Sequence, residues 1–109
     1  MTWPMVAGVA LLLTCACASL PHPTVLDVQR ARERHELLVS LAELDHGRAR
    51  YVAKCSSCHG LRLPESQPAA SWPRLIDEMV RDEEVTLTRE DREALETYLV
   101  ILATRPPAP

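Results

Sequence analysis

Residues at spacings of three and four recur along most of the chain, which is the period of a helix that buries one face. The first such run predicts a helix over about residues 25–38, built on Val25, Val28, Ala31, His35 and Leu38. Thr24 precedes it as a capping residue, and Asp27 stands in the capping-box position. A second capping box, Ser40 with Glu43, predicts that the next helix runs from Leu41 to about Lys54.

The middle of the chain lacks this period. Residues 60–70 contain a glycine and two prolines, so they are predicted to form a loop. Ser71 as N-cap and Pro73 in the first turn then predict a short helix over about 72–81.

The last predicted helix covers about residues 89–103. Thr88 caps it, Asp91 stands in the box position, and its apolar stripe consists of Leu95, Tyr98, Leu99 and Leu102. No segment alternates with a period of two, so the predicted fold class is all-α.

The first twenty-three residues carry no charged side chain. Their apolar run, "MVAGVALLL", is too short to cross a bilayer but suits the central region of a secretory leader, although the usual basic start is missing. We therefore divide the chain into a leader at 1–20, a linker and extra N-terminal helix at 21–39, a main domain at 40–104 and a proline-rich tail at 105–109.

The leader ends in "LLLTCACAS", where Cys17 follows a small residue and is the candidate lipid-modified residue of a bacterial lipoprotein. Cys15 is a poorer candidate, because Thr14 precedes it. Plain cleavage after the Ala16-Cys17-Ala18 triplet and a retained anchor are the alternatives. All three place the domain outside the cytoplasm, either free in the periplasm or anchored to the membrane facing it.

The composition indicates one small domain whose own hydrophobic core is too small to stabilise it without a further contribution. The chain has 109 residues, no Phe, and only two Trp and two Tyr, so it has few large apolar side chains to bury. A net charge of -3 is unlike that of a nucleic-acid-binding protein. A covalently held cofactor would add apolar surface that the core could bury.

The stretch "CSSCH" at 55–59 is the chemically most specific motif. A thioredoxin-like redox pair is disfavoured, because such a pair lies between a strand and a helix. A zinc site would need Cys55, Cys58, His59 and His46, although adjacent Cys58 and His59 fit one tetrahedral ion poorly. The remaining chemistry is attachment of haem c, in which Cys55 and Cys58 form thioethers and His59 binds the iron. This reading accounts for every residue of the motif.

Over residues 40–104 the chain resembles the small class I c-type cytochromes. The resemblance is carried by the haem motif, by Gly47, Tyr51 and Cys55 at intervals of four, and by Leu95, Tyr98 and Leu99. It implies a mono-haem domain in which the first and last helices of residues 40–104 cross around one haem. Within that fold Tyr51, Leu95 and Tyr98 are core residues.

The resemblance also implies a methionine as second iron ligand. Met79 is the only methionine after His59, although the interval is short and the residue has helical spacing to Leu75 and Ile76, as a core residue would. Five-coordinate iron, or ligation by His35 or His46, are the alternatives. Around the haem, Trp72 and Arg74 are candidate propionate contacts, with packing at the edge of the core as the alternative for Trp72. The Leu63–Pro64 segment is a candidate acceptor for the His59 ring N–H.

The predicted function is single-electron transfer between extracytoplasmic redox proteins, without enzymatic activity. Residues 76–98 hold nine acidic side chains against three arginines, which predicts an acidic face for a basic redox partner or simply a solvated helix face. The alternative function is a haem-based sensor or ligand-binding protein with an open or exchangeable sixth iron position.

Overall fold

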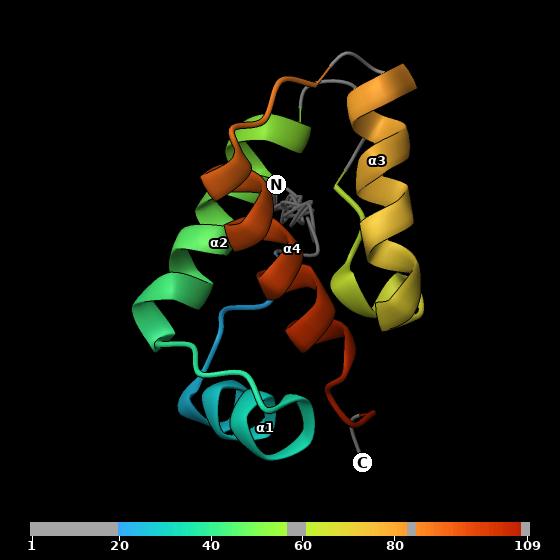
Figure 1. The fold of residues 1–109 in the computed structure, drawn as a ribbon. Coiled ribbons are helices and arrows are strands. Elements are labelled where there is room, and N and C mark those ends of the chain that lie inside the picture. The colour runs from blue at the N-terminus through green and yellow to red at the C-terminus, as the bar shows by residue number, and fades with distance from the viewer. Residues whose placement is uncertain (1–19, 57–60, 83–84, 108–109) are drawn as a thin grey trace, which may run out of the picture.

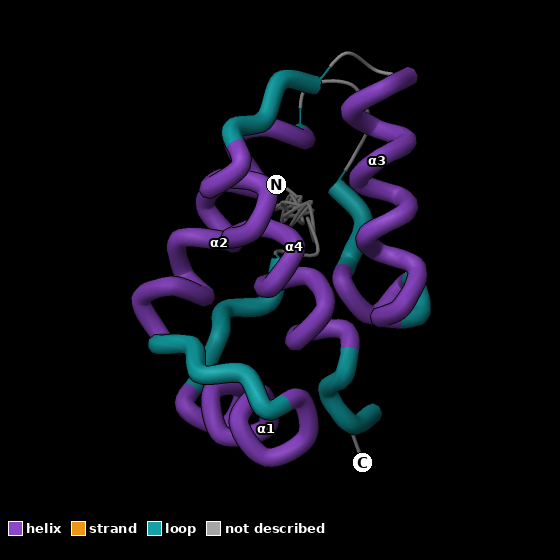
Figure 2. Tube along the Cα trace, viewed as in Figure 1, coloured by secondary structure: helices purple, strands orange, loops and turns teal. Residues whose placement is uncertain are grey.

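The computed structural model describes residues 20–56, 61–82 and 85–107, and in these residues every regular element is helical (Figures 1 and 2). The α-helices are α1 (Val25–His35), α2 (Leu41–Cys55), α3 (Trp72–Asp82) and α4 (Arg89–Ala103). Two short 3-10 helices, η1 (Pro64–Ser66) and η2 (Ala69–Ser71), lie between α2 and α3. The all-α prediction is confirmed.

The centre of the molecule is the contact between α2 and α4, which lie against each other in Figure 1. Gly47 of α2 is buried at this contact. A Cβ atom at position 47 would overlap the Ala94 carbonyl oxygen and would lie 2.8 Å from the Tyr98 Cβ. Glycine in mid-helix costs about 1 kcal/mol against alanine, and here the close approach of two backbones explains its presence.

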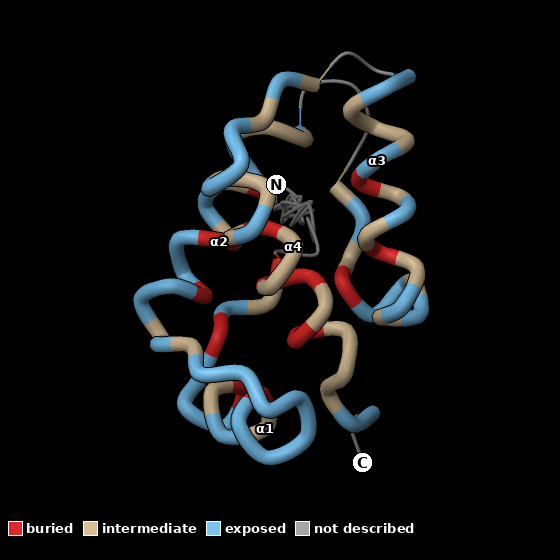
Figure 3. The backbone as a smooth tube through the Cα atoms, in the orientation of Figure 1, coloured by how far each residue is buried: buried red, intermediate tan, exposed pale blue. Residues whose placement is uncertain are grey.

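Most buried residues belong to α2, α3 and α4, and their positions along the backbone are red in Figure 3. Capping contacts fix where two of these helices begin. The Ser40 hydroxyl accepts a hydrogen bond from the Glu43 N–H at 3.0 Å, and the Thr88 hydroxyl accepts one from the Asp91 N–H at 3.0 Å. The core is formed by Leu44, Tyr51, Trp72, Ile76, Leu95, Tyr98, Leu99, Ile101 and Leu102, with Ala31 and Leu20 joining it from the N-terminal side.

The first helix is shorter than its sequence pattern predicts. It ends at His35 and not near residue 38, because Glu36 adopts a left-handed conformation with φ of 50°. The apolar residues at the ends of the predicted stripe do not pack on the core: Val25 is 64% exposed and Leu38 is 81% exposed. The burial that would favour three further helical residues is therefore missing.

The segment expected to be a plain loop contains the two 3-10 helices. Ser71 is the last residue of η2 and not an N-cap, and α3 follows it directly at Trp72. Pro64 opens η1, and Pro68, which precedes η2, has a φ of -56° that suits a tight turn.

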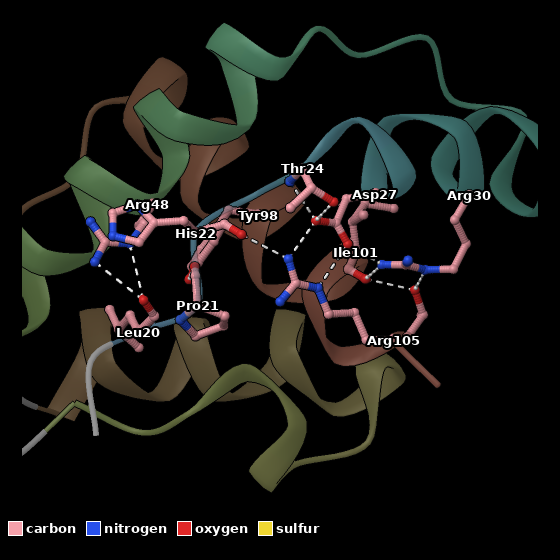
Figure 4. Close-up of polar contacts among 11 residues, drawn as sticks. Leu20, Pro21, His22, Thr24, Asp27, Arg30, Arg48, Tyr98, Ile101 and Arg105 are labelled. Carbon is pink, nitrogen blue, oxygen red and sulfur yellow. Dashed lines mark hydrogen bonds and ion pairs between the residues drawn. The ribbon is translucent and has the colours of Figure 1, made fainter. Parts of the chain in front are cut away.

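Residues 20–23, here called the N-terminal strap, lie against α2 and α4. Three consecutive carbonyls of this segment accept hydrogen bonds from side chains (Figure 4). Arg48 donates to Leu20 at 3.2 Å, the Tyr98 hydroxyl donates to Pro21 at 2.7 Å, and Arg105 donates to His22 at 2.7 Å. Leu20, which the sequence assigns to the end of the leader, and the first two residues of the predicted linker are thus held through their backbone carbonyls.

No helix in the described part of the chain is both long enough and apolar enough to span a bilayer.

Candidate haem site

Helix α2 carries the first residue of the candidate site. Gly47, Tyr51 and Cys55 follow one another at intervals of four, so they lie on the face of α2 that turns toward α4. Cys55 is the last residue of the helix, is half-buried and packs against the core. Its position at a helix end next to the core suits a thiol that attaches a large apolar group.

Three residues of the sequence prediction lie outside the described residues. These are Cys58 and His59 of the motif, and the candidate lipidation residue Cys17.

The chain just after the motif is tied back to α2. The Tyr51 hydroxyl donates a hydrogen bond to the Arg62 carbonyl at 2.9 Å and accepts one from the Arg62 N–H at 3.1 Å. Burial raises the pKa of Tyr51 to about 12, so the phenol stays protonated and able to donate. The sequence analysis placed Tyr51 in the core and missed this pair of bonds. A buried tyrosine needs a partner for its hydroxyl, and that signal was present.

Trp72 packs in the core and not at an exposed edge. Its side chain is fully buried, and its ring meets that of Tyr51 edge-on with centroids 6.1 Å apart. The indole N–H donates to the Pro64 carbonyl at 2.9 Å. An indole has a single donor, and in this structure the Pro64 carbonyl accepts it. The propionate contact of Trp72 stays a prediction.

The sequence predicts that a carbonyl of the Leu63–Pro64 segment accepts a hydrogen bond from the ring N–H of His59. Pro64 already accepts from Trp72, and Leu63 accepts from the Ser66 N–H at 3.0 Å and the Ser66 hydroxyl at 2.6 Å. These bonds hold the segment that follows the motif in η1.

Arg74 points away from the core. Its side chain is 66% exposed and pairs with Glu78 one turn further along α3, at 2.7 Å. An exposed ion pair of this kind contributes little to stability.

Met79 lies on the apolar stripe of α3. The stripe has the spacing of one helix face; two of its residues, Trp72 and Ile76, are buried and the others are half-buried. It consists of Trp72, Leu75, Ile76, Met79 and Val80. Met79 packs against the core cluster from the half-buried part. The two histidines weighed as alternative ligands, His35 and His46, are exposed on α1 and α2.

Half-buried apolar side chains pack against the core from the end of α2, from the chain after the motif, from α3 and from the segment before α4. These are Cys55, Leu61, Leu63, Leu75, Met79, Val80 and Leu87. A porphyrin presents an apolar body of the kind that would complete their burial. Among the described residues, no group of three or more His, Cys, Asp or Glu side chains converges as a metal site.

Comparison with known protein families matches residues 51–107 to the dihaem cytochrome c family. The match covers more than half of the chain. The chain belongs to this family. No curated protein and no solved structure matches it.

Membership makes this chain a c-type cytochrome, whose haem is bound covalently. The family match begins at Tyr51, contains the "CSSCH" motif and ends just after α4. The haem chemistry inferred from the motif and the family therefore agree. The match does not show that the chain is a mono-haem class I cytochrome, because the family is named for two haems.

Proposed function

We propose that this chain is an exported cytochrome that carries one haem c and passes single electrons between redox proteins. The observation that supports it is the motif from Cys55 to His59 inside the family match. The printed sequence contains one C-x-x-C-H motif, and each covalent haem needs such a motif. We therefore assign one haem to this chain, although the family is named for two.

In this proposal Cys55 and Cys58 would hold the haem by thioethers, and His59 and Met79 would be the iron ligands. The bound haem would supply one-electron redox chemistry. The identity of the ligands and the burial of the haem would tune its reduction potential. Met79 is half-buried on α3, so the core does not enclose it completely, which is compatible with a contact to the haem iron.

The proposed partners are redox proteins that approach an acidic face. Arginines lie among the acids of α3 and α4: Arg92 contacts Asp77 at 2.5 Å and Glu96 at 3.5 Å, and Arg89 contacts Glu93 at 3.1 Å. The balance of acidic and basic side chains already counts these arginines, so the region keeps a net negative charge that would attract a basic partner. We keep the periplasmic location and a lipid on Cys17 as part of the same proposal.

Equilibrium redox titration of the purified holoprotein tests the electron-carrier function. We expect one reversible one-electron step, a near-infrared charge-transfer band from methionine ligation in the ferric state, and no rapid binding of carbon monoxide to the ferrous state. Rapid carbon monoxide binding by the unmodified protein would instead support the sensor alternative.

A further inference from the structure

Two consecutive leucines between α1 and α2 lie at the surface. Leu37 is 38% exposed and Leu38 is 81% exposed, and most of the segment that joins the two helices is pale blue in Figure 3. Leucines exposed singly are ordinary on a protein surface, whereas apolar side chains that gather within a polar rim are typical of interaction sites. The surroundings of these leucines therefore decide their role.

The backbone fixes the position of both leucines. Glu36 has a left-handed φ of 50°, which residues other than glycine rarely adopt, and it turns the chain out of α1. The Leu37 N–H donates to the Ala31 carbonyl at 3.1 Å, and the capping box that begins α2 starts at Ser40. The two leucines thus lie between two capped helix ends, so their surface is formed before any partner binds.

The leucines line one side of a groove with a volume of about 450 Å³ between this segment, α2 and α4. The apolar part of its lining consists of Leu37, Leu38, Val39, Ala42 and Ala94. The groove shares no described residue with the candidate haem site. A partner that occupies it would bury these side chains without replacing any contact of that site.

The rim of the groove is acidic. Glu43, Glu90 and Glu93 line it, and among the described lining residues His46 is the only one with a basic side chain. Arg89 lies 3.1 Å from Glu93, but the two side chains are 90% and 65% exposed, so water and salt screen this pair. The charge of the rim disfavours an acidic partner and favours an apolar side chain flanked by lysines or arginines.

We propose that this groove docks a segment of the redox partner in which apolar side chains are flanked by basic ones. The apolar side chains would cover Leu37 and Leu38, and the basic ones would face the three glutamates of the rim. The inference rests on the proposed function only in taking the partner to be a redox protein. The chemistry of the segment follows from the lining of the groove.

Three synthetic peptides test this chemistry on the ferrous holoprotein. The first is a short peptide of leucine and lysine, the second has glutamate in place of lysine, and the third has serine in place of leucine. We expect the first to bind, the second not to bind, and the third to bind about tenfold more weakly than the first. In a nuclear magnetic resonance titration, the amide shifts should change mainly at Leu37, Leu38, Ala94 and Thr97.

Four single variants locate the binding. Leu38→Ser should weaken binding of the leucine–lysine peptide about tenfold, whereas Leu26→Ser, a leucine 67% exposed on α1 and outside the groove, should bind like wild type. Glu90→Gln should weaken binding about threefold at low salt and much less at high salt. Asp45→Asn, exposed on α2 outside the groove, should stay close to wild type. All four side chains are exposed, so each variant should fold.

Several results would overturn the proposal. These are no binding of the leucine–lysine peptide, equal binding of the glutamate analogue, or an equal loss of affinity in Leu38→Ser and Leu26→Ser. A wild-type dimer in analytical ultracentrifugation that Leu38→Ser abolishes would also overturn it, because the occupant would then be a second copy of this chain. The titration measures binding and not electron transfer, so failure of the proposed electron-carrier function would be seen separately.

Discussion

Asp27 and Arg105 form a two-point ion pair that joins the first turn of α1 to the chain just after α4. The Arg105 Nε and Nη2 atoms lie 2.9 and 2.6 Å from the two carboxylate oxygens of Asp27 (Figure 4). Arg30 adds a third contact at 2.7 Å, and the Thr24 N–H donates a fourth at 2.7 Å. The N-terminal helix is thus tied to the end of the last helix through one carboxylate that is 1% exposed.

This carboxylate should make stability depend on acid. Burial opposes the ionisation of Asp27, but the bonds from Arg105, Arg30 and Thr24 outweigh it and hold the pKa of Asp27 well below its ordinary value of 3.8. A lowered folded-state pKa contributes stability at neutral pH, and this contribution is lost as the pH falls below about 4. Asp27→Asn should cost about 2–4 kcal/mol at pH 7, since Arg105 is one-third exposed and partly screened.

Urea unfolding between pH 3 and pH 7 measures both effects. The difference in unfolding free energy between wild type and Asp27→Asn should shrink as the solution is acidified. A constant difference across this range would mean that the carboxylate is not the source of the stabilisation.

Gly47→Ala should destabilise the protein, although alanine normally favours a helix. The new methyl group would meet the Ala94 carbonyl oxygen, which is backbone and cannot turn away, so α2 and α4 must separate. We expect a loss of about 1–3 kcal/mol, measured by thermal or urea unfolding.

Ala49→Gly is the matched control, because residue 49 is exposed on the same helix. It should cost about 1 kcal/mol through helix propensity alone. A Gly47→Ala protein that melts at or above the wild-type temperature would contradict the close contact of the two helices.

The elements around the core could be predicted from the sequence because their signals are local. Capping residues located the start of α2 at Leu41 and of α4 at Arg89, and the position of Gly47 anticipated the helix contact. The C-x-x-C-H spacing predicted the haem chemistry that the family match supports.

The features that the sequence did not reveal depend on long-range contacts between polar groups. No pattern in the sequence indicates that Asp27 pairs with Arg105, which lies 78 residues further along the chain. The hydrogen bonds to the carbonyls of the N-terminal strap could not be predicted either, because every residue has a backbone carbonyl. The early end of α1 follows from apolar residues that find no partner in the fold. The Trp72 indole N–H donates to the Pro64 carbonyl. The sequence does not predict this hydrogen bond, because the position of that carbonyl depends on the folded η1 turn.

If Met79 is an iron ligand, Met79→Ala should change the reduction potential and the absorption spectrum of the haem. A thioether stabilises ferrous relative to ferric iron, so its loss should lower the reduction potential, remove the near-infrared band and allow carbon monoxide to bind. Potentiometry and absorption spectroscopy of the variant holoprotein measure these changes.

Leu75→Ala is the control, as another half-buried residue on the same stripe of α3. It should lower stability without changing the iron spectrum. If Met79 were only a core residue, Met79→Ala would lose about 2–5 kcal/mol of stability while its spectrum and potential stayed at wild-type values.

The most direct test of the account is the intact mass of the chain produced with a haem c maturation system. We expect the mature polypeptide plus the mass of one haem, retained after acid–acetone extraction and absent when Cys55 and Cys58 are both replaced by alanine. A wild-type mass without haem, a mass with two haems, or covalent haem in the double variant would contradict the proposed single attachment site.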